Sequence, residues 1–201
     1  MKLRHKAQLS VIITLAMLMV VLYVLLRIIL LYSFAQVEHQ AARHTVERLV
    51  NQLNDDLARL SSQVGDYAFW DDTYQFAQRY DETYVAELTG ETLANLNLNL
   101  TLWVDAQGKM IFYKLIDLAS LEDRPFPSQL SELLAADSPL GLQGMTTEGQ
   151  AGIFMVGSQP MMLAAKPILT STMEGPAQGM VIFGRWLDDA YIHQLSTTLR
   201  Q

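Results

Sequence analysis

The residues whose types and spacing are best suited to chemistry form an aromatic and acidic cluster in the first half of the chain. Five aromatic residues and three aspartates fall between Asp66 and Phe76. If this segment is helical, Trp70 and Tyr74 lie on one face of the helix. Aromatic rings give a ligand pocket apolar contact surface, and a carboxylate such as Asp71 can fix the orientation of the ligand. Two interpretations follow: the cluster is one wall of a ligand pocket, or it is a hydrophobic plug that joins a helix to the rest of the domain.

No enzyme signature accompanies the cluster. The sequence contains no glycine-rich phosphate loop, Walker motif, HExxH or GxSxG. The chain has no cysteine, which excludes disulfides, cysteine nucleophiles and cysteine-ligated metals. Asp71 and Asp72 are adjacent and point in different directions, and His39 and His44 are five positions apart rather than the four that align two ligands on a helix. The sequence therefore predicts a protein that is not an enzyme, with no catalytic residue, no metal site and no cofactor.

A long helix is predicted to position the cluster. Residues 36–65 contain no proline, and apolar residues recur along them at alternating gaps of four and three positions. These gaps average the 3.5-residue repeat of a coiled coil. The stripe predicts a homodimer through this helix; the alternative is that the stripe packs only on the chain's own domain. The candidate residues of the dimer seam are Val46, Val50, Leu53, Leu57, Leu60 and Val64.

The rest of the chain predicts a sheet with helices around it. A second helix is expected over residues 72–88, with Asp71 or Asp72 as its N-cap. Leucines at every second position from Leu96 to Leu102 indicate a strand with one buried face, which a turn at 105–108 joins to a second strand. We predict an α+β fold with a five-stranded antiparallel sheet and flanking helices. The remaining expected elements are a short helix within 125–137, strands near 152–157, 161–169 and 179–184, and a last helix from about residue 186.

The N-terminal part of the chain predicts a membrane anchor. Residues 9–31 are almost wholly apolar and follow a basic stretch, residues 1–8. About 20 apolar residues in a helix cross a bilayer, and a basic flank keeps its end of the helix in the cytoplasm. We expect a single-pass transmembrane helix with a cytoplasmic N-terminus and the remaining residues on the far side of the membrane. The alternative is a signal peptide cut after Ala35, although the apolar run exceeds the ~7–15 residues that are typical of one.

The part of the chain beyond Gln36 is acidic. It holds all 21 aspartates and glutamates but only ten of the 14 lysines and arginines, because Lys2, Arg4, Lys6 and Arg27 precede it; its net charge is therefore −11. An acidic surface without a lysine and arginine cluster argues against nucleic acid as a partner. The remaining length is that of one domain.

Five short motifs beyond the long helix occur in a fixed order and spacing. They are DYAFWDDTY from Asp66, WVDAQGK from Trp103, AKPIL from Ala165, GPAQG from Gly175 and GRWLD from Gly184. Together they make residues 66–199 resemble the fourth class of CHASE domains, the cyclase/histidine-kinase-associated sensory extracellular domains. The chain departs from the family at Glu87, where the resemblance would lead us to expect asparagine.

The resemblance implies an extracytoplasmic sensor domain with a PAS- or Cache-like fold. In a bacterium it implies an anchor in the inner membrane and a periplasmic domain that binds a small molecule. Such domains usually lie between two membrane spans and feed a GGDEF diguanylate cyclase, in cyclic-di-GMP signalling, or a histidine kinase. The sequence ends at Gln201, where the second span would begin, so we expect either a fragment or a sensor without its own output. The alternative function is a free-standing membrane-anchored adaptor that binds a partner protein.

The candidate ligand-binding residues follow from their positions in such a fold, where the ligand lies against the sheet and the helix over it. Lys166 precedes Pro167 and Arg185 closes the last strand. Either can hold an anionic group of the ligand or pair with one of the many acidic side chains. The full set of candidate ligand-binding residues is Tyr67, Trp70, Asp71, Tyr74, Trp103, Lys166 and Arg185.

Overall fold

The chain divides into two units. In the computed structural model the described residues are 2–134, 140–141 and 146–198, with side chains described for 14–27 and for the described residues from 44 to 197. The first unit is Met1–Val50, and the second, which contains the sheet, is Asn51–Gln201. Within the part of the chain that the structure describes, no helix combines the length and the apolar composition needed to cross a membrane.

The first helix, α1, runs from Lys2 to Ala68. It passes through Gly65, where the sequence predicted the end of the helix, and stops three residues later. A glycine lowers helix stability only modestly, so packing on a domain can hold one inside a helix. The side chain of Lys166 lies over Gly65, with its Cδ 3.5 Å from where a Cβ would be.

The segment predicted as one helix over residues 72–88 contains two helices, α2 (Asp71–Gln78) and α3 (Glu82–Ala86). Asp81 separates them as the N-cap of α3, because its carboxylate accepts a hydrogen bond from the backbone N–H of Thr83. Asp71 and Asp72 are not N-caps: Trp70 occupies that position without a side-chain hydrogen bond, and both aspartates lie in the first turn of α2. There their negative charge interacts favourably with the helix dipole.

A further helix, α4 (Gly90–Asn95), was not predicted. Thr89 is its N-cap, and the hydroxyl of Thr89 accepts a hydrogen bond from the N–H of Thr92. The strand expected from Leu96 begins only at Leu100. The alternating leucines before it therefore belong to the end of this short helix and to the turn that follows it.

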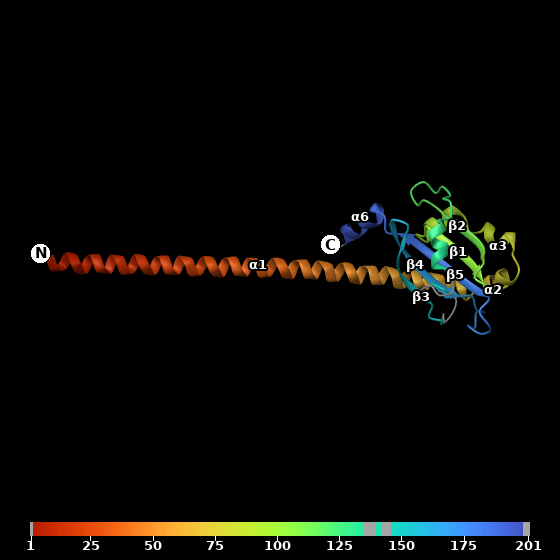
Figure 1. Cartoon of the computed structure of the whole chain (residues 1–201), viewed down its shortest axis with the longest axis horizontal. Coiled ribbons are helices and arrows are strands. Elements are labelled where there is room, and N and C mark those ends of the chain that lie inside the picture. The colour runs from red at the N-terminus through yellow and green to blue at the C-terminus, as the bar shows by residue number, and fades with distance from the viewer. Residues whose placement is uncertain (1, 135–139, 142–145, 199–201) are drawn as a thin grey trace. The chain divides into compact units, whose positions relative to one another are not determined.

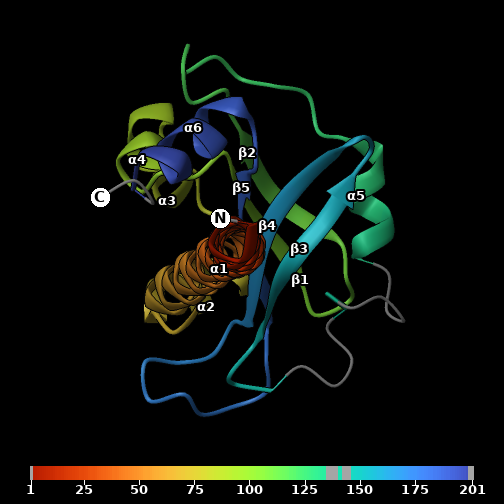
Figure 2. The same cartoon turned by 90° about the vertical axis from the view of Figure 1, so that its left-hand side faces the viewer.

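The five strands form one antiparallel sheet with the order β2-β1-β5-β4-β3. This confirms the predicted α+β fold with a five-stranded antiparallel sheet and flanking helices. The strands and the other helices of this part of the chain are β1 (Leu100–Asp105), β2 (Met110–Leu115), α5 (Ser128–Leu133), β3 (Gln150–Val156), β4 (Gln159–Pro167), β5 (Gly179–Trp186) and α6 (Asp189–Thr198). Figure 1 labels the five strands and α6, and Figure 2 labels α5.

The hairpin between β1 and β2 has the predicted turn. Its carboxylate anchor is Asp105, which accepts hydrogen bonds from the N–H groups of Gln107 and Lys109 at 2.9 and 2.8 Å. Gly108 takes a φ of 81°, a conformation that favours glycine.

Both faces of the central strands are covered. One face carries Leu100, Leu102 and Val104 of β1, which pack with Leu130 of α5 in an aliphatic core. The opposite face carries Trp103, which lies against rings of α2 and α3. Figure 2 shows α2, α3, α4 and α6 on one side of the sheet and α5 on the other. The prediction that the first strand has a single buried face is therefore wrong, because helices cover the face that the sequence pattern assigned to water.

The close approach of β5 to β1 can be tested at Gly179. Its φ is 142°, and a Cβ at this position would overlap the carbonyl oxygen of Val104 on the neighbouring strand. We expect Gly179→Ala to lower the free energy of unfolding by about 3 kcal/mol or more, measured by denaturant unfolding. Gly108→Ala is the matched control, since Gly108 also has a positive φ but a Cβ added there would meet nothing within 4 Å. It should cost only about 1 kcal/mol, and equal losses for the two variants would refute the close approach.

Candidate ligand-binding site

An aromatic layer covers the helix-facing side of the sheet. Its centre is Trp103, which is fully buried. The Trp103 ring lies 6.4 Å from the ring of Phe76 in α2, 6.1 Å from that of Tyr84 in α3 and 6.3 Å from that of Phe183 in β5, each in an edge-on arrangement. Edge-on pairs of this kind are favourable beyond the area that they bury. The layer therefore ties α2 and α3 to the two central strands.

Two of the predicted site residues join this layer where α1 ends and α2 begins: Tyr67 in the last turn of α1 and Trp70 at the N-cap of α2. The Tyr67 ring contacts that of Phe183 at 5.3 Å and that of Trp70 at 6.5 Å, and Trp70 contacts Tyr84 at 6.4 Å. Of the predicted residues, the structure thus brings Tyr67, Trp70 and Trp103 together. Trp103 is closed off from solvent, whereas 44% of Trp70 remains exposed.

A cavity of about 680 Å³ opens at the exposed edge of the aromatic layer. Ligand pockets of small molecules have volumes of roughly 300–1,000 Å³. Four rings line this one, those of Trp70, Phe76, Tyr80 and Tyr84. The polar side chains around it come from α2, α3 and their flanking segments and are Asp72, Gln75, Arg79, Asp81, Glu82, Thr83 and Glu87.

Tyr84, one of the rings that line this cavity, takes part in a hydrogen bond between two hydroxyl groups. Thr73 is fully buried, and its Oγ1 lies 2.5 Å from the hydroxyl oxygen of Tyr84. Burial raises the pKa of Tyr84 to about 12, and the bond to Thr73 opposes this shift. The Trp103 side chain also opposes the rise in the pKa of Tyr84, although its indole N–H has no hydrogen-bond partner among the described residues. Tyr84 therefore stays a neutral donor and acceptor at physiological pH.

Asp71 and Tyr74 serve a different contact from the one predicted for them. The Asp71 carboxylate accepts hydrogen bonds from the backbone N–H and the hydroxyl of Ser171, both at 2.9 Å. The Tyr74 hydroxyl accepts one from Nε2 of Gln178 at 3.1 Å. Both contacts attach α2 to the turn between β4 and β5. Neither residue lines the aromatic cavity, and the ligand-binding role predicted for them stays a prediction.

Lys166 and Arg185 do not line the aromatic cavity, and the two side chains contact different residues. The ammonium of Lys166 lies 5.4 Å from the centroid of the Phe69 ring. The guanidinium of Arg185 lies 4.8 Å from the centroid of the Tyr191 ring and donates to Oε1 of Gln194 at 3.1 Å. Burial lowers the pKa of Arg185 from its usual value. Both cations thus contact aromatic rings, which attract them through the ring quadrupole.

A junction between the first and last helices of the domain was missed by the sequence analysis. The Tyr191 hydroxyl of α6 donates to Oδ2 of Asp56 in α1 at 2.8 Å. Burial and the hydrogen bond to Asp56 raise the pKa of Tyr191. Arg185 packs on the same tyrosine ring. The two bonded residues are 135 positions apart, and no local pattern marks such a pair; Tyr80 and Tyr84, by contrast, continue the aromatic cluster and were open to detection.

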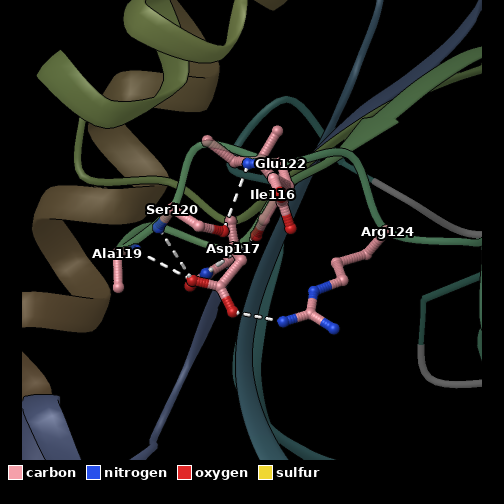
Figure 3. A network of polar contacts seen from close by, with 7 residues as sticks. Ile116, Asp117, Ala119, Ser120, Glu122 and Arg124 are labelled. Carbon is pink, nitrogen blue, oxygen red and sulfur yellow. Dashed lines mark hydrogen bonds and ion pairs between the residues drawn. The ribbon is translucent and has the colours of Figure 1, made fainter.

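A second cavity, of about 790 Å³, lies beside the ends of β1, β2 and β5 and the start of α6. Figure 3 shows the polar network at its rim. The Asp117 carboxylate accepts hydrogen bonds from the N–H groups of Ala119 and Ser120, and it pairs with Arg124 at 2.6 Å. The pairing with Arg124 holds the pKa of Asp117 below its usual range. Since this carboxylate already has a charged partner, the network is suited to holding the loop, and the aromatic cavity is the better candidate for a ligand.

The predicted dimer seam is divided by burial. Leu60 and Val64 are 4% and 0% exposed, so they pack within their own chain. Val46 and Val50 are 61% and 47% exposed, and Leu53 and Leu57 are half-buried. The interpretation that the stripe packs on its own domain thus applies to its last residues, and any surface for a second chain is restricted to the earlier ones.

Comparison with known protein families identifies the second unit. The model of the CHASE4 domain matches residues 52–201, about three quarters of the chain. The chain belongs to the CHASE4 family. CHASE4 is a sensory domain, so the resemblance predicted from the five motifs is confirmed.

Relatives of this CHASE4 domain include signalling proteins. The chain is 27% identical over 159 residues to the methanogenesis regulatory histidine kinase FilI of Methanothrix harundinacea (strain 6Ac). The alignment covers 79% of this chain but 18% of that kinase, so the chain spans less than a fifth of the length of this relative.

Two solved structures share the fold. The extracellular domain assigned to the histidine kinase vpHK1S-Z8 has a TM-score of 0.52 and 12% identity, over 80% of this chain and 59% of that one. A domain assigned to a sensory box/GGDEF family protein of Vibrio parahaemolyticus has a TM-score of 0.56 and 11% identity, over 78% and 62%. At these identities the similarity establishes the fold alone.

The contact between Asp71 and Ser171 predicts a pH dependence. Hydrogen bonds from the backbone N–H and then the hydroxyl of Ser171 lower the pKa of Asp71. A depressed carboxyl pKa contributes stability that is present above the unfolded pKa and is lost as pH falls through the folded pKa. We expect Ser171→Ala to raise the Asp71 pKa while leaving it below the usual value, because the backbone N–H remains. Carboxyl NMR titration between about pH 2 and pH 6 measures this shift, and a pKa unchanged by Ser171→Ala would contradict the assigned contact.

Proposed function

We propose that the chain is the ligand-binding input part of a membrane-anchored, extracytoplasmic signal-transduction protein. The observation that carries this proposal is the coincidence of two boundaries. The CHASE4 match covers residues 52–201, and the compact unit that contains the sheet is Asn51–Gln201. The sensory family therefore accounts for a whole folded unit rather than for a few scattered motifs.

The sequence supports an anchored, extracytoplasmic location. Residues 9–31 are almost wholly apolar and follow a basic stretch, the arrangement of an anchor whose N-terminus stays in the cytoplasm. The solved relative named above is an extracellular domain. In a bacterium this topology corresponds to an inner-membrane anchor and a periplasmic sensor domain.

The signal in this proposal passes from the aromatic cavity to the α1–α6 junction. A ligand in the cavity touches Trp70 and Tyr84, whose rings contact Tyr67 at the end of α1 and Trp103 in the sheet. At the other end of the same unit, α1 and α6 are joined by the Asp56–Tyr191 bond. A ligand changes the balance between two arrangements only by its difference in affinity for them. We therefore propose two arrangements of α2 and α3 that differ in the position of α1 relative to α6.

The output in this proposal is a histidine kinase or a cyclic-di-GMP synthesising GGDEF domain. The relatives supply both classes: FilI is a histidine kinase, and one of the solved structures belongs to a sensory box/GGDEF family protein. In either case the CHASE4 domain supplies the input, and the kinase or GGDEF domain supplies the catalysis. The input does not depend on which of the two outputs follows it.

The α1–α6 junction gives a test of this function. We expect Tyr191→Phe, in a chimera that joins this chain to the membrane span and kinase core of a characterised sensor kinase, to change basal kinase activity severalfold. The change removes a hydrogen bond to a carboxylate, worth about 1.5–3 kcal/mol, that links α1 to α6. Tyr74→Phe is the matched control, because it also removes a tyrosine side-chain bond but at the turn near Gln178. Equal effects of the two variants on basal kinase activity would refute the junction as the signalling contact. A chimera in which the domain does not influence kinase activity at all would favour an adaptor.

The exposed part of the stripe on α1 gives a second test, of the homodimer. The chain has no cysteine, so a single introduced cysteine reports one contact. We expect Val50→Cys to form disulfide-linked dimers in membranes several times more readily than Arg48→Cys. Val46 and Val50 share one helical face, and Arg48, which is also exposed, lies on another. Comparable crosslinking at both positions would exclude a seam at this part of α1.

A further inference from the structure

We infer that the ligand of the aromatic cavity is an organic cation, a molecule with an alkylammonium group and apolar substituents. This inference rests on the proposed sensory function and adds the chemical class of the ligand. It follows from two properties of the side chains around the cavity: large aromatic residues that are partly exposed to solvent and an excess of negative charge.

The first property is that large rings stay partly open to solvent at the cavity. Trp70 is 44% exposed and Tyr80 is 52% exposed. Behind them, the rings of Phe76 and Tyr84 are stacked at 4.6 Å with an angle of 19° between their planes, and Tyr80 lies 5.5 Å from Phe76. The rings are thus held in place by one another before a ligand arrives. A cation within about 6 Å of such ring faces is attracted by their quadrupoles, most strongly by that of tryptophan.

The second property is the charge of the lining. Four carboxylates and one guanidinium line the cavity, which gives a net charge of −3. The carboxylates are those of Asp72, Asp81, Glu82 and Glu87, and the guanidinium is that of Arg79. Hydrogen bonds from the side chain and then the backbone of Thr83 lower the pKa of Asp81, so this carboxylate stays charged. A lining of this sign raises the local concentration of cations and opposes anions.

An organic cation fits these properties better than an anion or a metal ion. An anionic ligand would be attracted by one arginine and repelled by four carboxylates. Within the residues that the structure describes, no three histidine, aspartate or glutamate side chains are grouped as metal ligands. The rings also supply apolar contact, which a bare metal ion does not use. The remaining class has a diffuse positive charge and an apolar surface.

The test measures the binding of choline and of 3,3-dimethylbutan-1-ol, its neutral isostere with carbon in place of nitrogen. Isothermal titration calorimetry on the full chain in neutral detergent compares the two at low and at physiological salt. We expect choline to bind roughly tenfold more tightly than the neutral isostere, since only the charged head gains the ring and carboxylate interactions. Added salt should weaken choline binding and leave that of the isostere unchanged. Equal affinity for the two molecules would overturn the inference.

Variants of the cavity separate the contribution of the rings from that of the charges. Trp70→Leu keeps an apolar side chain and removes the ring, so we expect choline binding to weaken roughly tenfold, whereas Trp70→Phe should weaken it less. The double variant Asp72→Asn, Glu87→Gln should weaken binding and reduce its salt dependence. Glu91→Gln is the matched control, because Glu91 is an exposed acid of α4 outside the cavity lining. The site would be contradicted if Trp70→Leu left the affinity for choline unchanged, or if Glu91→Gln lowered that affinity as much as the cavity variants do.

The outcomes also separate this inference from the proposed function. If choline does not bind while the chimera still responds to Tyr191→Phe, the ligand class is wrong and the sensory role stands. If choline binds with the expected dependence on Trp70 but leaves the output of the chimera unchanged, the cation site stands and the sensory role of the cavity is wrong.

Discussion

The structure depends on covering the second face of its sheet. β1, β4 and β5 are buried on both sides, so a sheet that faced water would expose Trp103, Val181 and Phe183. Fully burying a large apolar side chain contributes about 1.5–3 kcal/mol, and the helices of the N-terminal half supply this cover through the end of α1, α2 and α3. Because α3 has five residues and short helices are marginal by themselves, the contacts of Phe76 and Tyr84 with Trp103 hold the helices as much as they shield the strand.

The same cover joins the end of the long helix to the domain. The last turns of α1 contribute Leu60, Val64 and Ala68 to the buried face, so separating α1 from the domain would expose apolar surface. Tyr191 adds a directional contact, since its hydroxyl has one acceptor on α1, the Asp56 carboxylate. Apolar packing thus sets the distance of the helix from the sheet, and one hydrogen bond to a charged group fixes its position relative to α6.

The features that could be predicted from the sequence are those that depend on residues close together along the chain. The turn at Asp105–Gly108, the short helix near Ser128 and the five strands along the chain have local signals, and the fold class followed from them. The place of β5 between β1 and β4 was not predicted, because it depends on pairing between distant segments. The split between α2 and α3 was missed because Asp81, its cause, lies inside a segment that otherwise suits one helix. Of the candidate site, Tyr67, Trp70 and Trp103 were brought together, whereas Asp71 turned to Ser171, one hundred positions away. The sequence does not indicate from which distant N–H group a given carboxylate will accept a hydrogen bond.

The position of the cavity at the edge of the aromatic layer, rather than in its centre, has an energetic reason. Trp103 and Phe76 are 0% and 2% exposed, so a ligand at the centre would have to displace a packed ring. Losing the packing of one phenylalanine costs about 3–5 kcal/mol, a large part of the ~8 kcal/mol that a micromolar ligand gains on binding. A ligand that binds over Trp70 and Tyr80 leaves this packing intact. Its binding energy is then not offset by the loss of a buried ring.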